Sequence, residues 1–156
     1  MTTWTKAFAD RLPQGPYNGS REVEWTVNGM HISLRLADLD RLGCLLEKVV
    51  LKPTAHSPLD FDPASLGQRF RYLGETLAII EQENEEGRVI LRSSPPSEDV
   101  THIYFFELVV DRNEGLSLAR YAYNRGDPER KMISAPLTTH ALGCLVGDLE
   151  RFAAGV

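Results

Sequence analysis

The sequence predicts an α+β protein in which two amphipathic helices pack on an antiparallel sheet of six or seven strands. Alternating apolar and polar residues flank several turn signals, a pattern typical of β-hairpins, and other segments carry apolar residues at helical spacing. The tetrapeptide Leu-Gly-Cys-Leu also occurs twice, at residues 42–45 and 142–145. We therefore expect a partial internal duplication of a hairpin-helix unit over residues 21–52 and 88–153, with a loop near 53–65.

Composition indicates an ordinary globular protein. The chain has 156 residues, of which 42% are hydrophobic and 25% charged, which fits one domain spanning residues 1–156. No apolar run approaches the roughly 18 residues of a membrane-spanning helix, and the first residues lack the pattern of a secretory signal. We therefore expect a soluble, cytoplasmic protein with no membrane contact.

The clearest local prediction is a hairpin around Asn28-Gly29. Both central residues of a type I′ turn need positive φ, which Asn-Gly tolerates. This turn sets Trp25 opposite Ile32 and Val23 opposite Leu34 on one face. Glu22 then falls opposite Arg35, so the apolar pairing and the charge pairing agree.

Apolar residues at intervals of three and four predict the helices. Leu39, Leu42, Leu46 and Val49 would form one stripe of a helix that Asp38 caps and that ends before Pro53. The same spacing predicts a short helix at residues 3–12 and a last helix from a cap at Thr138 to Phe152. Asp62-Pro63 indicates the start of another short helix.

Five further strands are predicted after Gly74. Residues 76–83 and 88–93 form a hairpin with Glu83 opposite Arg88, and residues 116–124 and 130–135 form the last strands. Residues 102–111 are apolar on both faces, so this strand should be internal and covered on both sides. Helices, loops or a partner subunit would provide that cover. If the chain supplies only one helical layer, a second subunit must cover the other face, which predicts a homodimer.

Cysteine and histidine do not occur in metal-site or catalytic spacing. Cys44 and Cys144 are not in a C-x-x-C pair, and we expect both to be small buried hydrophobes beside Gly43 and Gly143, where close packing needs glycine. Only His140 and Cys144, one helical turn apart, could form a catalytic pair. We expect no catalytic residues, no metal site and no cofactor.

An aromatic and basic surface is the candidate ligand site. Antiparallel pairing of the strands at 102–111 and 116–124 is expected to bring Tyr121 and Tyr123 beside one face of Tyr104 and Phe106. The candidate ligand-binding residues are Tyr104, Phe106, Arg120, Tyr121, Tyr123 and Arg125. Aromatic rings can stack on bases and guanidinium groups can hold phosphates.

Three functions follow, in order of preference. The first is a non-enzymatic binding or adaptor domain for a protein or peptide partner. The second is single-stranded nucleic-acid binding through the Tyr/Arg sheet face, which the net charge of −5 opposes. In the arrangement of a strand meander followed by a helix, residues 88–152 are similar to PUR-repeat and Whirly-type nucleic-acid binders, whereas the size and acidity resemble small secretion chaperones. The third is a small enzyme using Cys144 or a histidine.

Overall fold

The computed structural model describes residues 21–39, 42–54, 58–83 and 87–155. Its strands are β1 (Arg21–Val27), β2 (Met30–Leu39), β3 (Gly43–Lys52), β4 (Leu77–Glu83), β5 (Arg88–Ser93), β6 (Ser97–Glu98), β7 (His102–Asp111), β8 (Gly115–Asn124), β9 (Lys131–Ile133) and β10 (Ala135–Thr138). Its helices are α2 (Pro63–Arg69), the 3-10 helix η1 (Arg71–Leu73) and α3 (Thr139–Ala153). The α+β class with an antiparallel sheet is confirmed, although the fold is mostly sheet.

Within the described ranges the sheet contains ten strands, more than the six or seven predicted. Its main order is β1-β2-β3-β8-β7-β5-β4, and β7 is internal as expected. The three strands that were not predicted are β3, β6 and β10. Long strands extend past one neighbour and pair with another, since β8 pairs with β3 through residues 116–119 and with β9 through residues 120–122. Short strands β6, β9 and β10 thus satisfy backbone groups that the main neighbours leave open.

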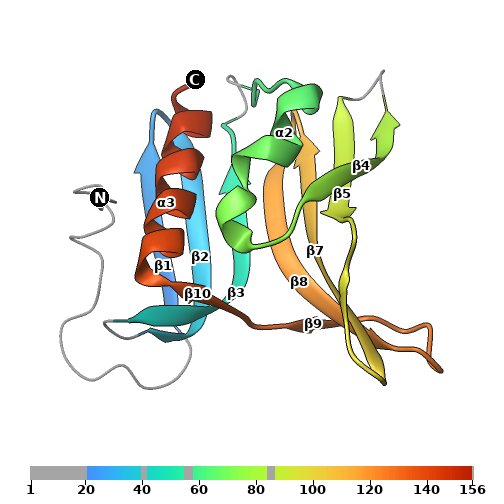
Figure 1. Ribbon diagram of the computed structural model, residues 1–156. Helices are drawn as coiled ribbons and strands as arrows, with labels where there is room; N and C mark the ends of the chain where they lie inside the picture. Colours follow the sequence, from blue (N-terminus) through green and yellow to red (C-terminus); the bar gives the residue numbers. More distant parts are fainter. Residues whose placement is uncertain (1–20, 40–41, 55–57, 84–86, 156) are drawn as a thin grey trace.

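Both helices lie on the same face of the sheet, which we call the inner face (Figure 1). Thr138 caps α3 by accepting a hydrogen bond from the Ala141 amide, and Leu142, Leu145 and Leu149 of α3 are fully buried. Asp62 caps α2 through the Ala64 amide. These two helix starts are confirmed, because each depends on a local cap and an apolar periodicity.

The first hairpin has the predicted register. Trp25 pairs with Ile32, Val23 with Leu34 and Glu22 with Arg35. Asn28 and Gly29 have φ values of 50° and 79°, as the two-residue turn requires. The second hairpin likewise pairs Glu83 with Arg88.

The helix predicted after Asp38 is wrong, because residues 43–52 form strand β3. Cys44, Leu46, Val49 and Leu51 are its buried residues. A register shift between the pairs Arg35–Lys48 and Leu36–Leu46 leaves Glu47 as an additional residue. This bulge lengthens the interval between buried Leu46 and Val49 from two to three, which imitates part of a helical stripe.

The repeated tetrapeptide therefore does not mark a duplicated unit. Leu42 directly precedes β3 and residues 43–45 begin it, whereas Leu142 to Leu145 lie within α3. The expectation for Gly43 was right in its physical reason, since a Cβ there would overlap the backbone oxygen of Leu137 on neighbouring β10. The helix predicted at residues 3–12 lies outside the described residues.

Candidate functional site

The candidate site lies on the outer face of the sheet, opposite α2 and α3. Side chains alternate along β7, so Phe106, Leu108 and Val110 join the core on the inner face. Phe105, Glu107 and Val109 consequently project to the outer face. No described helix covers this part of the outer face (Figure 1). A polar and aromatic cluster occupies it.

We name this group the arginine–aromatic cluster, and it consists of Arg92, Phe105, Glu107, Tyr121, Tyr123 and Arg130. Phe105 pairs with Tyr121 across β7 and β8, and their rings stack with centroids 5.8 Å apart. Tyr123 meets Phe105 edge-on at 6.2 Å. The guanidinium of Arg130 lies 4.0 Å from the Tyr121 ring centroid, and that of Arg92 lies 5.3 Å from the Phe105 ring centroid. The cations are therefore held against aromatic faces.

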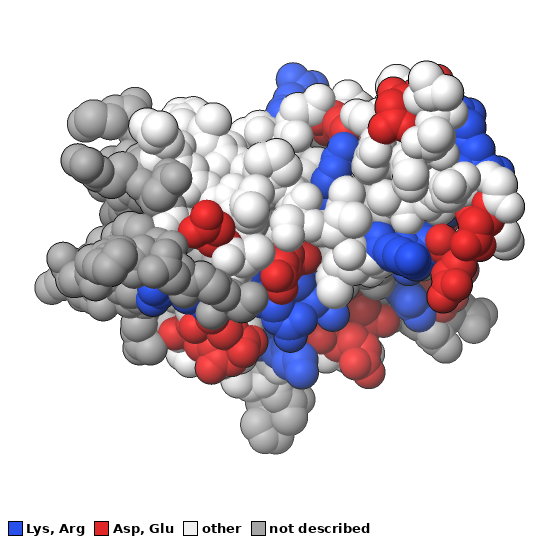
Figure 2. Space-filling model, turned by 90° about the horizontal axis from the view of Figure 1, so that it is seen from below, with Lys and Arg blue, Asp and Glu red and all other residues white. Residues whose placement is uncertain are grey.

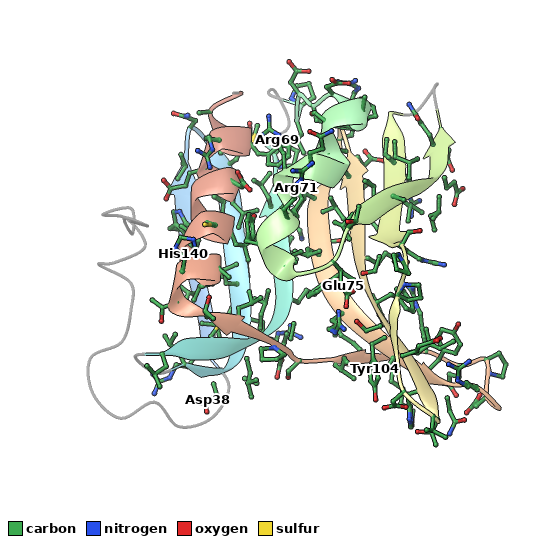
Figure 3. The ribbon with its side chains drawn as sticks, viewed as in Figure 1. Asp38, Arg69, Arg71, Glu75, Tyr104 and His140 are labelled. Atoms are coloured by element: carbon green, nitrogen blue, oxygen red, sulfur yellow. The ribbon has the colours of Figure 1, made fainter. Side chains whose placement is uncertain are left out.

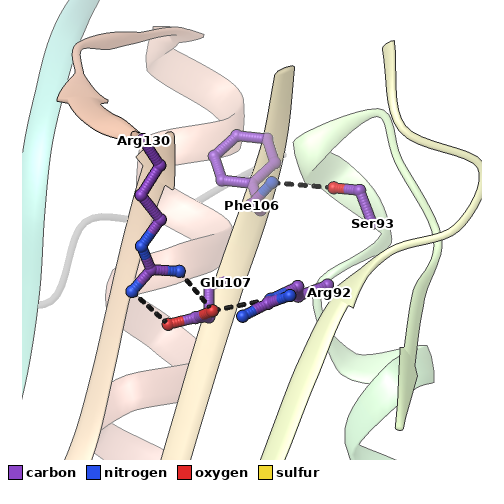
Figure 4. A network of polar contacts seen from close by, with 5 residues as sticks. All are labelled: Arg92, Ser93, Phe106, Glu107 and Arg130. Carbon is purple, nitrogen blue, oxygen red and sulfur yellow. Dashed lines mark hydrogen bonds and ion pairs between the residues drawn. The ribbon is translucent and has the colours of Figure 1, made fainter. Parts of the chain in front are cut away.

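Glu107 anchors both arginines. Its carboxylate accepts hydrogen bonds from Arg92 Nε at 2.7 Å and from Arg130 at 2.7 and 3.2 Å (Figure 4). Only 8% of the Glu107 side chain is exposed, compared with 43% for Arg92 and 39% for Arg130. A nearly buried carboxylate thus positions two cations that solvent can reach.

The same contacts set the charge of the cluster. Burial would raise the pKa of Glu107, but hydrogen bonds from Arg130 and Arg92 outweigh burial and lower it. The bond to Glu107 correspondingly raises the pKa of Arg130. Glu107 is therefore ionised at neutral pH, and the two arginines and one carboxylate carry a net positive charge.

Arg92 has unused hydrogen-bonding capacity. Its Nε donates to Glu107, but its two terminal nitrogens make no hydrogen bond with any residue in the described ranges. These nitrogens form the part of the guanidinium fork that binds carboxylates and phosphates. The cluster can thus bind an anionic group without breaking an internal ion pair.

A second ionic network lies on the inner face. Arg120 donates two hydrogen bonds to Glu75, at 3.1 and 3.0 Å, and Ser93 and Ser97 donate to the same carboxylate. Burial would raise the pKa of Glu75, but these hydrogen bonds lower it. Ser93 also accepts a hydrogen bond from the Phe106 amide at 2.8 Å (Figure 4). Because every partner is already engaged, this network serves the fold.

The structure separates the six predicted ligand-binding residues. Tyr121 and Tyr123 share the outer face, whereas Phe106 is buried in the core and Arg120 lies over its ring at 4.6 Å. Tyr104 lies low on the inner side of β7, below Glu75, and donates a hydrogen bond of 2.7 Å to Asp99 (Figure 3). The sixth residue, Arg125, pairs with exposed Glu98 at 2.8 Å. The predicted common face is therefore wrong.

The length of one turn explains the error. Asp111 pairs with Gly115, which leaves three residues in the turn between β7 and β8. Odd-numbered residues therefore pair with odd-numbered residues, so Tyr121 meets Phe105. A turn shorter by one residue would have paired Tyr121 with Phe106, as predicted.

Sequence reasoning missed Arg92, Phe105 and Glu107 as site residues. A signal was present, because Glu107 is the only charged residue between Ile103 and Val110 in an otherwise apolar strand. Such a charge is rarely buried without a partner. Arg92, the charged residue next to Leu91 in β5, lies directly opposite Glu107 in the sheet register.

The possible catalytic pair is adjacent in space. Cys144 Sγ lies 3.6 Å from His140 Nε2 on the solvent side of α3, and Cys144 is half-buried, not buried as predicted. His140 is the second residue of α3, and Cys144 lies one turn further along, where backbone amides bond to carbonyls one turn earlier. The amides next to Cys144 are therefore engaged within the helix and do not form an oxyanion hole around its sulfur.

The fold and site thus define an α+β protein that is mostly antiparallel sheet and carries an arginine–aromatic surface. Comparison with known proteins found no matching family model, curated protein or solved structure. In the described ranges, His, Cys, Asp and Glu form no group of three or more suited to a metal ion. No described helix combines the length and apolar character needed to cross a membrane.

Proposed function

We propose that the protein is a non-enzymatic binding or adaptor domain that holds a protein or peptide partner on the outer face. The observation that carries this proposal is the pair Arg92 and Arg130. Each guanidinium lies over an aromatic ring, and both are anchored by one nearly buried carboxylate, Glu107. The partner group that this arrangement suits is a carboxylate flanked by apolar side chains.

The physical support is preorganisation. Arginine and tyrosine are enriched among residues that dominate binding energy at protein interfaces. An arginine that must be ordered on binding loses side-chain entropy, which costs roughly 0.5–1.5 kcal/mol. The bond from Glu107 and the ring of Phe105 already restrict Arg92, which lowers that cost.

Single-stranded nucleic acid is the second candidate. Stacked Phe105 and Tyr121 with Arg130 above them offer a ring and a cation side by side, as base stacking and phosphate contact require. The protein's net charge of −5 opposes this ligand. Any such binding is expected to weaken steeply with salt.

A homodimer in the cytoplasm also remains a proposal. The apolar character of β7 is the argument for a second subunit, but Phe105 and Glu107 are already buried within one chain. Half-buried Val109 is the part of β7 that a second copy would still cover. Light scattering at micromolar concentrations tests this, since a monomer at every concentration removes the dimer.

The binding proposal is tested by fluorescence anisotropy. The probes are a labelled peptide of alternating Glu and Val and a labelled oligothymidylate, each titrated at low salt. Arg92→Gln should weaken peptide binding about tenfold, because a charge-assisted hydrogen bond is lost. Arg125→Gln is the matched control, because Arg125 is similarly exposed (46%) but lies outside the cluster. Equal peptide affinities for the two variants would contradict the proposal.

A further inference from the structure

A basic hollow adjoins the arginine–aromatic cluster on the outer face. It has a volume of about 560 Å³ and is built from outward-facing residues of β3, β5, β7 and β8. Its cations are Lys48, Lys52 and Arg88, and Val50 and Val109 form its apolar lining. Positive charge thus continues from the cluster along the same face.

The three cations of the hollow have unused charge. Within the described ranges, none of Lys48, Lys52 and Arg88 forms an ion pair or a side-chain hydrogen bond. Two acidic residues, Asp111 and Glu114, also line the hollow. Asp111 already accepts hydrogen bonds from the amides of Asn113 and Glu114 and stabilises the turn. A ligand carboxylate could therefore enter without displacing an existing partner.

Several other cations of the surface, unlike these three, form ion pairs. Seen from below, several Lys and Arg side chains lie directly beside Asp and Glu side chains (Figure 2). Arg125 with Glu98 and Arg112 with Asp60 are exposed examples. The cations of the hollow are therefore available to a ligand, unlike the arginines of these two pairs.

Sheet register arranges the outer face in rows. One row runs Lys48, Ala119, Glu107, Arg92, and the next runs Val50, Ser117, Val109, Ile90. A third row contains Arg88 opposite Asp111, with Lys52 next to Leu51 in β3. Two charged rows therefore flank one largely apolar row.

The spacing of these rows matches an extended peptide. Arg88 and Arg92 lie four residues apart on β5, which corresponds to roughly 13 Å at the rise of a strand. A ligand strand lying lengthwise on the face has the same rise. Acidic residues at its positions i and i+4 would meet the two charged rows, and an apolar residue at i+2 would meet Val50 and Val109.

We infer that the outer face binds an extended acidic peptide of a partner protein lengthwise, in the pattern acidic-x-apolar-x-acidic. This inference rests on the proposed function and specifies its partner. Isolated carboxylates suit the face better than a phosphate backbone, because exposed Glu81 of β4 lies opposite Ile90 at the end of the apolar row, between the two charged rows. A continuous polyanion would meet this acidic flank and the net charge of −5.

The test compares two peptides of identical composition by fluorescence anisotropy. One is Glu-Thr-Val-Thr-Glu, with acidic residues at i and i+4, and the other is Glu-Glu-Val-Thr-Thr, both flanked by Gly-Ser. Binding is measured to the wild type, to Arg92→Gln, and to the double variant Lys52→Gln with Arg88→Gln. Arg71→Gln, an exposed arginine on the helix-covered side, controls for net charge. Thermal unfolding confirms that each variant is folded.

The expected result has three parts. The spaced peptide binds the wild type about tenfold more tightly than the rearranged peptide does. Arg92→Gln and the double variant each lose about tenfold in affinity for the spaced peptide. Arg71→Gln changes this affinity little. If only Arg92→Gln loses affinity and the two peptides bind equally well, the lengthwise inference is overturned and the proposed function stands. No loss in Arg92→Gln overturns the proposed function as well. Binding of oligothymidylate in place of either peptide overturns the choice of occupant.

Discussion

Glu75 and Arg120 form a bidentate ion pair in which only 12% and 14% of the two side chains are exposed. The pair joins the segment after η1 to the central strand β8, across 45 residues of sequence. The planar guanidinium matches both carboxylate oxygens, and Phe106 supports it from below. Removing one partner leaves the other charge unpaired in a largely buried position.

Glu75→Gln should therefore destabilise the fold by about 3 kcal/mol, within the range for breaking a buried pair. The measurement is the free energy of unfolding in urea at neutral pH. Glu98→Gln is the control, because its pair with Arg125 is exposed and should contribute less than about 1 kcal/mol. Similar losses in the two variants would show that the Glu75 pair is no more protected than a surface pair.

Stability should decline in acid because the pKa values of Glu75 and Glu107 are lowered in the folded state. Above 4.5, the ordinary pKa of a glutamate, both carboxylates are ionised in the folded and in the unfolded state, and their stabilisation of the fold is complete. As the pH falls from 4.5 to the lowered pKa values, the unfolded state binds protons before the folded state does, and the stabilisation is lost. Urea midpoints should be flat from neutral pH to about 5 and then fall. The fall should be shallower in Glu107→Gln, and an unchanged slope in that variant would count against the cluster.

Gly115→Ala should be much more harmful than Gly29→Ala. Gly115 has a φ of 102°, and a Cβ there would overlap the backbone oxygen of Leu51 in β3. Gly29 has a φ of 79°, but the nearest atom to its Cβ would be a methyl of Thr54 at 3.5 Å. We expect losses of about 2–4 and about 1 kcal/mol, measured by urea unfolding. Equal losses would mean that β3 can move away from the turn.

The two cysteines should differ in reactivity. Cys44 is 7% exposed within the core, whereas Cys144 is half-buried beside His140. In the folded protein, iodoacetamide should modify Cys144 and leave Cys44 unmodified until urea unfolds the chain. Peptide mass spectrometry distinguishes the two sites. Modification of both thiols at one rate would indicate that the β3 end opens readily.

The candidate site was only partly predictable because it depends on whether the turn between β7 and β8 holds an odd or an even number of residues. Tyr121 and Tyr123 were recognised from their alternation in the sequence. Their neighbours depend on whether the turn before Gly115 holds two or three residues, and no local rule decided this. Phe105 and Glu107 consequently replaced Tyr104 and Phe106 as their partners.

The sequence alone determined the elements whose signals are local. Asn28-Gly29 set the first hairpin and its register, and Thr138 with the following apolar spacing set α3, because these geometries depend on residues a few positions apart. Only the tertiary structure decided that residues 43–52 form a strand. There the backbone gains hydrogen-bond partners from β2, β8 and β10, and the Glu47 bulge keeps Leu46 and Val49 in one core. Contacts between distant segments outweighed a helix-like periodicity, which is why the same Leu-Gly-Cys-Leu residues adopt two structures in one chain.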